Sequence, residues 1–211
     1  VFAGAVMHTP VEVTAEALQR AVALKADGVV AVGGGSTTGL GKAIALHTHL
    51  PQVVVPTNYA GSEMTPVLGQ TRNGVKTTQS SPKILPETVI YDVDLTLRLP
   101  PGLTAVSGLN AMAHAAEALY ARDRNPVTSL MAEEALRVLA TALPVLVAQP
   151  ADRDARWQAL YGAWLCGACL GAVGMALHHK LCHVLGGAFD LPHAATPPLL
   201  LPPALASHPP A

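Results

Sequence analysis

Four histidines lie within a short stretch near the C-terminal end of the chain: His178, His179, His183 and His193. His179 and His183 are four residues apart and would share one face of a helix, and the glycine-rich loop that follows can bring His193 to the same point. Neutral imidazoles that converge in this way bind Zn²⁺ or Fe²⁺, or exchange protons near neutral pH. One such histidine would more often be a buried, hydrogen-bonded residue, but the cluster predicts a site.

An earlier pair, Asn110 and His114, has the same helical spacing and could form the other wall of this site. Cys166 and Cys169 form a C-x-x-C pair within a run of small residues, with no second pair to complete a metal site. We therefore expect them to be buried packing residues. Surface positions are expected for the remaining histidines, His8, His47, His49 and His208.

A glycine-rich turn, Gly33 to Ser36, follows a valine-rich run and precedes a helical stretch. Glycines let the backbone approach an anion closely, and a helix that begins there presents unpaired N–H groups and the positive end of its dipole. The turn therefore suits a pyrophosphate. Because it departs from the G-x-G-x-x-G pattern, a plain connection is an equal alternative from the residues alone.

Residues 56–65 leave the C-terminal end of the next predicted strand, where open α/β sheets bind their ligands. The stretch is dense in hydroxyl and amide side chains, among them Thr57, Asn58, Ser62 and Thr65. A cofactor contact and a polar loop that caps itself are nearly equal interpretations of this spacing.

The first hundred residues alternate short β-branched runs with helical stretches, which is typical of βαβ units on a parallel sheet. Asn73 and Gly74, between extended runs, predict a hairpin with a type I′ turn. The other expected elements are helices over 14–26, with Thr14 as N-cap, and 40–46, and strands over 29–32, 52–55 and 88–92.

Pro100, Pro101 and Gly102 mark a boundary, because they stop strand pairing and let the chain turn. We expect an α/β dinucleotide-binding domain over 1–100 and an all-helical domain over 101–211. Residues 158–177 are uncharged and about long enough to span a bilayer, but small residues suit close helix packing, so a buried helix is favoured. The expected helices of the second domain cover 105–121, 128–146 and 154–185.

The composition, 211 residues with 50% hydrophobic and 13% charged side chains, predicts a globular chain with a sizeable core. A formal net charge of -1 disfavours nucleic acid and membrane surfaces as partners. Three cysteines without framework spacing, and no visible export signal, favour the cytoplasm. The start without Met and the end without a helical pattern predict a partial chain.

Taken together, four motifs resemble the iron-containing alcohol dehydrogenase family in order and spacing. They are Gly33 to Ser36, Pro56 to Glu63, Ser107 to Glu117, and His179-x-x-x-His183-x-Leu-Gly continuing to Pro192-His193. The resemblance implies a parallel-sheet dinucleotide-binding part, similar to that of dehydroquinate synthase, followed by an all-helical catalytic part. Details such as Gly39-Leu40-Gly41-Lys42 and Val89 to Asp94 are similar to the maleylacetate reductases within this family, which reduce the C=C bond of maleylacetate to 3-oxoadipate in aromatic-compound degradation.

The resemblance also implies roles for individual residues. The family's metal ligands, an Asp and three His, correspond to Asn110, His114, His179 and His193; an amide in place of a carboxylate is a poor ligand for Fe or Zn, so a divalent metal stays open. Catalytic positions are implied for His114, His179, His183 and His193. Substrate contacts are implied for Asn58, Tyr59, Asn110 and His183. Contacts to NADH or NADPH are implied for Gly34, Gly35, Ser36, Thr57, Asn58, Ser62, Thr65 and Lys76.

The expected chemistry is hydride transfer to the alkene carbon conjugated to the ketone of a small dicarboxylate, with the histidines binding the enolate and returning a proton. A homodimer is implied by the same resemblance. The alternatives are a metal-dependent alcohol dehydrogenase that acts on a carbonyl, which Asn110 disfavours, and an inactive member of the family. Where relatives continue into a helix, the prolines between residues 196 and 203 predict that it is broken or begins late.

Overall fold

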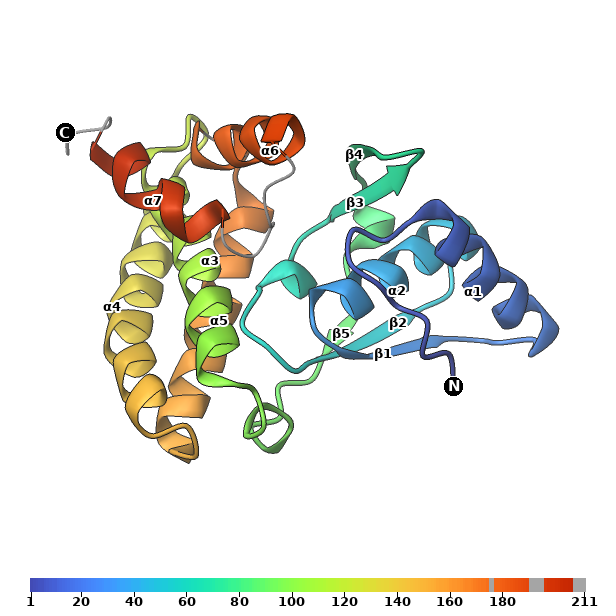
Figure 1. Cartoon of the computed structure of the whole chain (residues 1–211), viewed down its shortest axis with the longest axis horizontal. Helices are drawn as coiled ribbons and strands as arrows, with labels where there is room; N and C mark the ends of the chain where they lie inside the picture. The colour runs from blue at the N-terminus through green and yellow to red at the C-terminus, as the bar shows by residue number, and fades with distance from the viewer. Residues whose placement is uncertain (175–176, 190–195, 207–211) are drawn as a thin grey trace. The chain divides into compact units, whose positions relative to one another are not determined.

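The computed structural model describes residues 1–174, 177–189 and 196–206, which Figure 1 traces from blue to red. Two compact units make up the chain. The first comprises Val1–Thr57 and Ser62–Asp92, and the second comprises Asn58–Gly61 and Val93–Ala211. The short segment Asn58–Gly61 therefore belongs to the second unit, although its neighbours in the sequence belong to the first.

A parallel sheet forms the centre of the first unit, with strand order β1 (Val29–Gly33), β2 (Gln52–Pro56) and β5 (Thr88–Val89). Helix α2 (Gly35–Thr48) connects β1 to β2, which is the βαβ crossover that the sequence predicts. Ala31 and Val54 are buried in the core, as the valine-rich pattern of the two strands requires. The predicted parallel α/β fold is confirmed.

Both helices of this unit begin earlier than predicted. Helix α1 spans Val11–Ala23, and the Thr14 hydroxyl lies inside its first turn and donates to the Pro10 carbonyl oxygen at 3.2 Å. The prediction that Thr14 caps the helix is wrong, because Pro10 supplies a preset φ just ahead of the first turn. Helix α2 starts at Gly35 rather than at Leu40, because the small and hydroxyl residues of its first turns carry no apolar stripe.

The predicted hairpin is confirmed by antiparallel pairing of β3 (Val67–Arg72) with β4 (Val75–Ser80). Asn73 and Gly74 adopt φ values of 51° and 74°, the positive angles that a type I′ turn requires. Strand β5 is shorter than the predicted 88–92. After the Ile90 N–H donates to the Val54 carbonyl oxygen, no further residue of this segment pairs with the sheet. Single turns of 3₁₀-helix complete the described connections: η1 (Ser62–Met64), η2 (Pro82–Ile84) and η3 (Asp94–Thr96).

The second unit is all-helical in its described part, which confirms the predicted class. Prolines at 101 and 126 occupy first turns of helices, where the missing N–H costs no hydrogen bond. Asn125 closes a capping box with Thr128 at the start of the second of these helices. The helices are α3 (Pro101–Tyr120), α4 (Pro126–Ala148), α5 (Arg153–Ala172), α6 (Leu177–Phe189) and α7 (Thr196–Ala206).

The single helix predicted over 154–185 is wrong, since α5 ends at Ala172 and α6 begins at Leu177. Val173 has extended backbone angles, and the Gly174 N–H donates to the Asp123 carboxylate at 2.9 Å. A tertiary contact thus holds the chain outside the helix. Because glycines and alanines recur throughout this stretch, Gly174, which directly follows the C-cap, does not stand out in the sequence as a stop signal.

The prediction of a broken or late final helix is also wrong, because α7 is helical from Thr196 to Ala206 with Pro202 and Pro203 inside it. Two further prolines, Pro197 and Pro198, lie in the first turn, which tolerates them. The helix packs against α3 and α6. This packing offsets the hydrogen bonds that the interior prolines cannot donate.

Small residues dominate the interface of α3, α4 and α5, where Ala111, Ala132 and Ala159 are fully buried. Cys166 and Cys169 are buried free thiols, as predicted, and burial raises the pKa of the Cys169 thiol to about 11. Within the described ranges, no helix has the length and apolar character needed to cross a membrane.

Replacement of Gly162 by alanine tests how closely α4 and α5 approach. A Cβ at this position would lie 2.7 Å from Cγ of the fully buried Leu139. We expect Gly162→Ala to lower the free energy of unfolding by about 1–2 kcal/mol, because overpacking outweighs the gain in helix propensity. Urea denaturation measures this, and Gly102→Ala is the control, since Gly102 has open space around it. A Gly162→Ala protein as stable as the control variant would contradict the close approach.

Candidate active site

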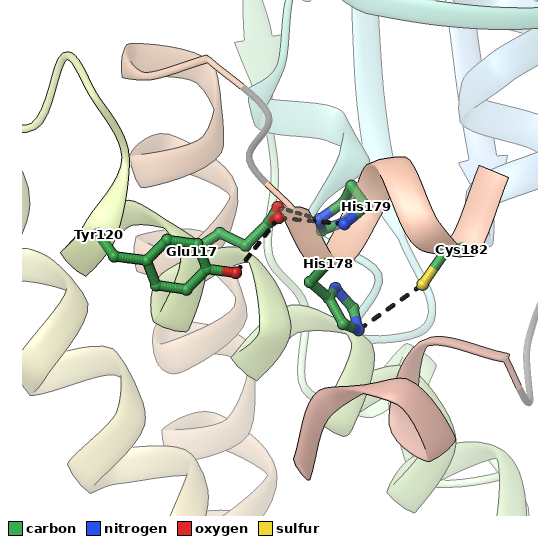
Figure 2. Close-up of polar contacts among 5 residues, drawn as sticks. All are labelled: Glu117, Tyr120, His178, His179 and Cys182. Atoms are coloured by element: carbon green, nitrogen blue, oxygen red, sulfur yellow. Dashed lines mark hydrogen bonds and ion pairs between the residues drawn. The ribbon is translucent and has the colours of Figure 1, made fainter. Parts of the chain in front are cut away.

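Two helices of the second unit bring a carboxylate and an imidazole into direct contact. Glu117 lies on α3 and His179 on α6, and both side chains are buried (Figure 2). The backbone N–H of His179 donates to Oε1 of Glu117 at 3.0 Å, and Nδ1 of the same residue is hydrogen-bonded to Oε2. Because a carboxylate only accepts, Nδ1 of His179 carries the proton of this hydrogen bond, and Nε2 is left for other partners. Glu117 therefore sets both the orientation and the tautomer of His179.

The Glu117 carboxylate also accepts from Tyr120, one turn later on the same helix, at 3.5 Å. Burial by itself would raise the pKa of Glu117, but the hydrogen bond and the charge of His179 hold this pKa below its ordinary value. Burial and the charge of Glu117 raise the pKa of Tyr120 to about 12. Glu117 is thus the charged centre of a buried polar cluster.

Two more histidines surround His179. The ring of His114, which comes from α3, has its centroid 4.8 Å from that of His179. The ring of His178 packs edge-on against His179 at 5.1 Å, and its Nε2 lies 3.6 Å from the Cys182 sulfur. The structure therefore assembles three imidazoles around one carboxylate, and His114 and His179, which are far apart in the sequence, become neighbours.

The described donors do not form a good site for a divalent cation. Glu117, His178 and His179 each offer a ligand atom, and these atoms lie within 4.8 Å of one another. However, the Glu117 carboxylate is already hydrogen-bonded to His179. The expected ligand positions among the described residues supply an amide, Asn110, and two imidazoles, without a carboxylate.

Some sequence-predicted residues fall outside the described part. His193 lies outside the described residues, and the side chains of His183 and Lys76 are likewise not described, although their backbones belong to α6 and β4. Asn110 is half-buried on α3, one turn before His114.

The first unit contains the glycine-rich turn, at the start of α2. Gly34 is the N-cap of α2, and among the described residues no side chain caps this helix. Its first turn contains no acidic residue, and the N–H groups of Thr37 and Thr38 bond back to the Gly34 carbonyl oxygen. The exposed positive end of the helix dipole can therefore accept an anion such as a pyrophosphate.

The polar segment after β2 is divided between the two units. Asn58 uses its Oδ1 to accept from the Ala60 N–H at 3.3 Å, which is the self-capping alternative that the sequence leaves open. The Ser62 hydroxyl oxygen, by contrast, is buried and has no hydrogen-bond partner among the described residues. Such an unsatisfied hydroxyl is a natural contact for a polar ligand.

Sequence reasoning missed Lys42, which lies in the middle of α2 and is 1% exposed. Its ammonium group donates to the carbonyl oxygens of Ser62, Thr65 and Val67. Burial lowers the pKa of Lys42 to about 7, while the charge of Glu63 acts to raise it. A lysine within the apolar stripe of a helix is the only signal in the sequence.

Glu63 itself is buried beside this lysine, and the Tyr91 hydroxyl donates to its Oε1 at 2.9 Å. Burial raises the pKa of Glu63, and the hydrogen bond from Tyr91 and the charge of Lys42 oppose that rise. Burial, together with the nearby Glu63, also raises the pKa of Tyr91. The first unit thus buries a lysine and a glutamate close enough to influence each other's pKa.

Tyr59, an expected substrate contact, lies in the segment that belongs to the second unit. Its side chain is fully buried, and its hydroxyl accepts from Nη1 of Arg156 at 3.0 Å. Its backbone N–H donates to the Ser107 hydroxyl at 3.4 Å. The phenol hydroxyl therefore links its own segment to the helices of the second unit.

Arg156, on α5, is fully buried without a carboxylate partner among the described residues. It satisfies its charge with oxygens of Tyr59, Thr104, Leu99 and Pro150, at 2.9 to 3.1 Å. An arginine three residues into a helix of small residues carries no sequence signal for this role. Glu117, in contrast, could have been found from its helical spacing to His114.

Comparison with known proteins connects both units to one family. Residues 1–93 match the family model described as iron-containing alcohol dehydrogenase, and residues 104–208 match the one described as Fe-containing alcohol dehydrogenase family, C-terminal. A maleylacetate reductase from Rhizobium sp. (strain MTP-10005) is 67% identical over 96% of this chain. One from Burkholderia cepacia is 63% identical over 98%. The chain spans 58% of the length of each of these relatives.

Solved structures agree with the sequence comparisons. The crystal structure of maleylacetate reductase from Rhizobium sp. strain MTP-10005 superposes with a TM-score of 0.95 at 66% identity, covering 98% of this chain and 59% of that one. The enzyme of the same name from Agrobacterium tumefaciens gives a TM-score of 0.96 at 66% identity, with the same coverage of 98% and 59%.

Proposed function

Since this chain belongs to the iron-containing alcohol dehydrogenase family, we propose that it acts as a maleylacetate reductase, with NADH or NADPH as the reductant. The substrate would be maleylacetate or its chloro-substituted forms, and the product 3-oxoadipate or its substituted equivalent. The observation that carries the proposal is that the ring of His114 lies beside that of His179, which Glu117 orients, in a chain that has Asn110 at the position expected for the family's Asp ligand. The high identity to reductases of this name supports it.

A bound nicotinamide would supply the hydride. Two features of the first unit fit such a group: the uncapped N-terminus of α2 for the pyrophosphate, and the unsatisfied Ser62 hydroxyl. We propose the cofactor contacts expected from the sequence, namely Gly34, Gly35, Ser36, Thr57, Asn58, Ser62, Thr65 and Lys76.

The histidines would handle the charge that hydride addition creates. Addition to the alkene carbon conjugated to the ketone leaves an enolate, whose oxygen needs a donor and whose adjacent carbon needs a proton. Because Glu117 occupies Nδ1, His179 can donate only from Nε2, and only as the imidazolium, whose charge the Glu117 carboxylate would stabilise. We propose His114, His179, His183 and His193 as the acid–base and oxyanion-binding groups. The proposed substrate contacts are Asn58, Tyr59, Asn110 and His183.

No step of this mechanism passes through a metal ion, because the donors at the expected ligand positions do not fit one. The three cysteines are free thiols, which supports a cytoplasmic location as part of the proposal. A homodimer is proposed on the same family grounds.

The proposal predicts that the purified protein oxidises NADH or NADPH, followed at its ultraviolet absorbance, when maleylacetate is added. A chelator should leave this rate within about twofold of its starting value, since no catalytic role is assigned to a metal. Loss of the rate with chelator and its return with Fe²⁺ or Zn²⁺, together with oxidation of primary alcohols, would identify a metal-dependent alcohol dehydrogenase instead. Cofactor binding without reduction would identify an inactive member of the family.

A further inference from the structure

We propose that Lys42 is a positioning residue that holds the segment Ser62–Thr65 in the shape that binds the nicotinamide cofactor. The inference rests on the proposed function, because that function makes Ser62 and Thr65 cofactor contacts. Lys42 itself would touch neither cofactor nor substrate.

The ammonium group of Lys42 contacts oxygen atoms of one short segment. Nζ of Lys42 lies 2.8 Å from the Thr65 carbonyl oxygen, 3.1 Å from the Thr65 hydroxyl and 3.0 Å from the Val67 carbonyl oxygen. It also donates to the Ser62 carbonyl oxygen. Three protons are thus shared among four oxygens, and all four belong to one short stretch of chain. One side chain therefore determines the course of that stretch.

The backbone that Lys42 holds carries the hydroxyl groups of Ser62 and Thr65. The Thr65 hydroxyl, which accepts from Lys42, donates in turn to the Ser62 carbonyl oxygen at 3.0 Å and closes the turn η1. With its carbonyl oxygen held by Lys42, Ser62 keeps a buried hydroxyl without a partner among the described residues. The residue is therefore held firmly through its main chain while its side chain stays available to a ligand.

Lys42 lies on α2, the helix whose N-terminus is proposed to bind the pyrophosphate. The same helix begins at Gly35, in the turn proposed for the pyrophosphate, and Lys42 follows two turns later, about 10 Å along the axis. Lys42 thus ties the segment Ser62–Thr65 to the helix that carries the phosphate contacts. Both proposed parts of the cofactor site are thereby held on one rigid element of the first unit.

Burial of the Lys42 ammonium group costs free energy. An ammonium group that is 1% exposed is an unfavourable way to fill a core, because removing a charge from water costs free energy that burying an apolar side chain does not. The pKa of Lys42, lowered to about 7 by burial, reflects that cost. A requirement to hold carbonyl oxygens in a functional arrangement explains why a lysine occupies this position.

The test is Lys42→Met, which keeps the length of the side chain and removes its donors. We expect the Kd for NADH, measured by fluorescence titration, and the KM for NADH to rise at least tenfold, while kcat falls less than threefold. Lys42→Gln, which retains two amide protons, should raise the Kd by an intermediate amount and serves as the second variant if Lys42→Met does not fold.

The matched control is Ile44→Ala, because Ile44 is buried on the same helix in a hydrophobic cluster with Ala17 and Leu40 and carries no hydrogen-bond donor in its side chain. It should lose stability and leave the Kd for NADH unchanged. A Kd within twofold of wild type for Lys42→Met, or an equal rise in Ile44→Ala, overturns the inference. Because the Kd needs no turnover, a wild-type protein that binds NADH but does not reduce maleylacetate refutes only the proposed function. A wild-type protein that binds neither NADH nor NADPH overturns both.

Discussion

Arg156→Met is expected to lower the free energy of unfolding by about 3 kcal/mol, since each buried acceptor left without its donor costs about 1–3 kcal/mol. The guanidinium donates to the Leu99 and Pro150 carbonyl oxygens and to the hydroxyls of Tyr59 and Thr104. The hydroxyls can turn towards other partners, but the carbonyl oxygens cannot. Urea denaturation followed by circular dichroism measures the loss.

Arg153→Met is the matched control for this substitution. Arg153 lies on the same helix, one turn earlier, but its side chain is 60% exposed and its partner is the equally exposed Asp94. An exposed ion pair contributes less than about 1 kcal/mol, so this variant should be nearly as stable as wild type. Tyr59→Phe, which removes one acceptor of Arg156, should cost about 1 kcal/mol. Equal losses in the Arg156 and Arg153 variants would show that the buried network is not the source of the stability.

Glu117→Gln should lower kcat for NADH-linked reduction of maleylacetate about 100-fold, within the range that acid–base catalysis contributes. The amide has one acceptor oxygen where the carboxylate has two, so it cannot bind both the backbone N–H and the ring of His179 as Glu117 does. The ring then loses its fixed orientation and tautomer. The KM for NADH should change little, because the cofactor contacts proposed above come from other segments.

Glu134→Gln is the control, since it makes the same chemical change at an exposed pair with Arg137 on α4. It should leave both kcat and stability unaltered, because an exposed ion pair contributes little. His179→Ala should lower kcat further than Glu117→Gln does, because it removes the imidazole itself. If Glu117→Gln retains the wild-type kcat, then Glu117 does not position His179 for catalysis.

Lys42 and Arg156 could not be identified from the sequence, and the physical reason is the same for both. Lys42 and Arg156 each bind oxygens from segments distant in the sequence, and most of these oxygens are main-chain carbonyls that every residue carries. No residue type at the partner positions reveals such a contact. Glu117 differs, because its helical spacing to His114 is visible, and only its partner on α6 is not.

Some element boundaries follow from local sequence, and others depend on contacts between distant segments. The strands at β1 and β2 and the Asn73-Gly74 hairpin could be predicted because β-branched runs and a turn with positive φ are local properties. The end of α5 could not, because Asp123 holds Gly174 out of the helix across a long sequence separation. Helix α7 formed despite its prolines because α3 and α6 pack against it.

The histidine cluster shows what each level determined. The α/β and helical parts, the order of the motifs and the helical spacing of His179 and His183 could be inferred from the sequence, because these depend on neighbours along the chain. The fold was needed to bring the ring of His114 beside that of His179, to place Glu117 against Nδ1 of His179, and to turn Tyr59 into the core towards Arg156. These outcomes depend on burial, where an unpaired charge or donor is costly and each polar group must find its partner across the fold.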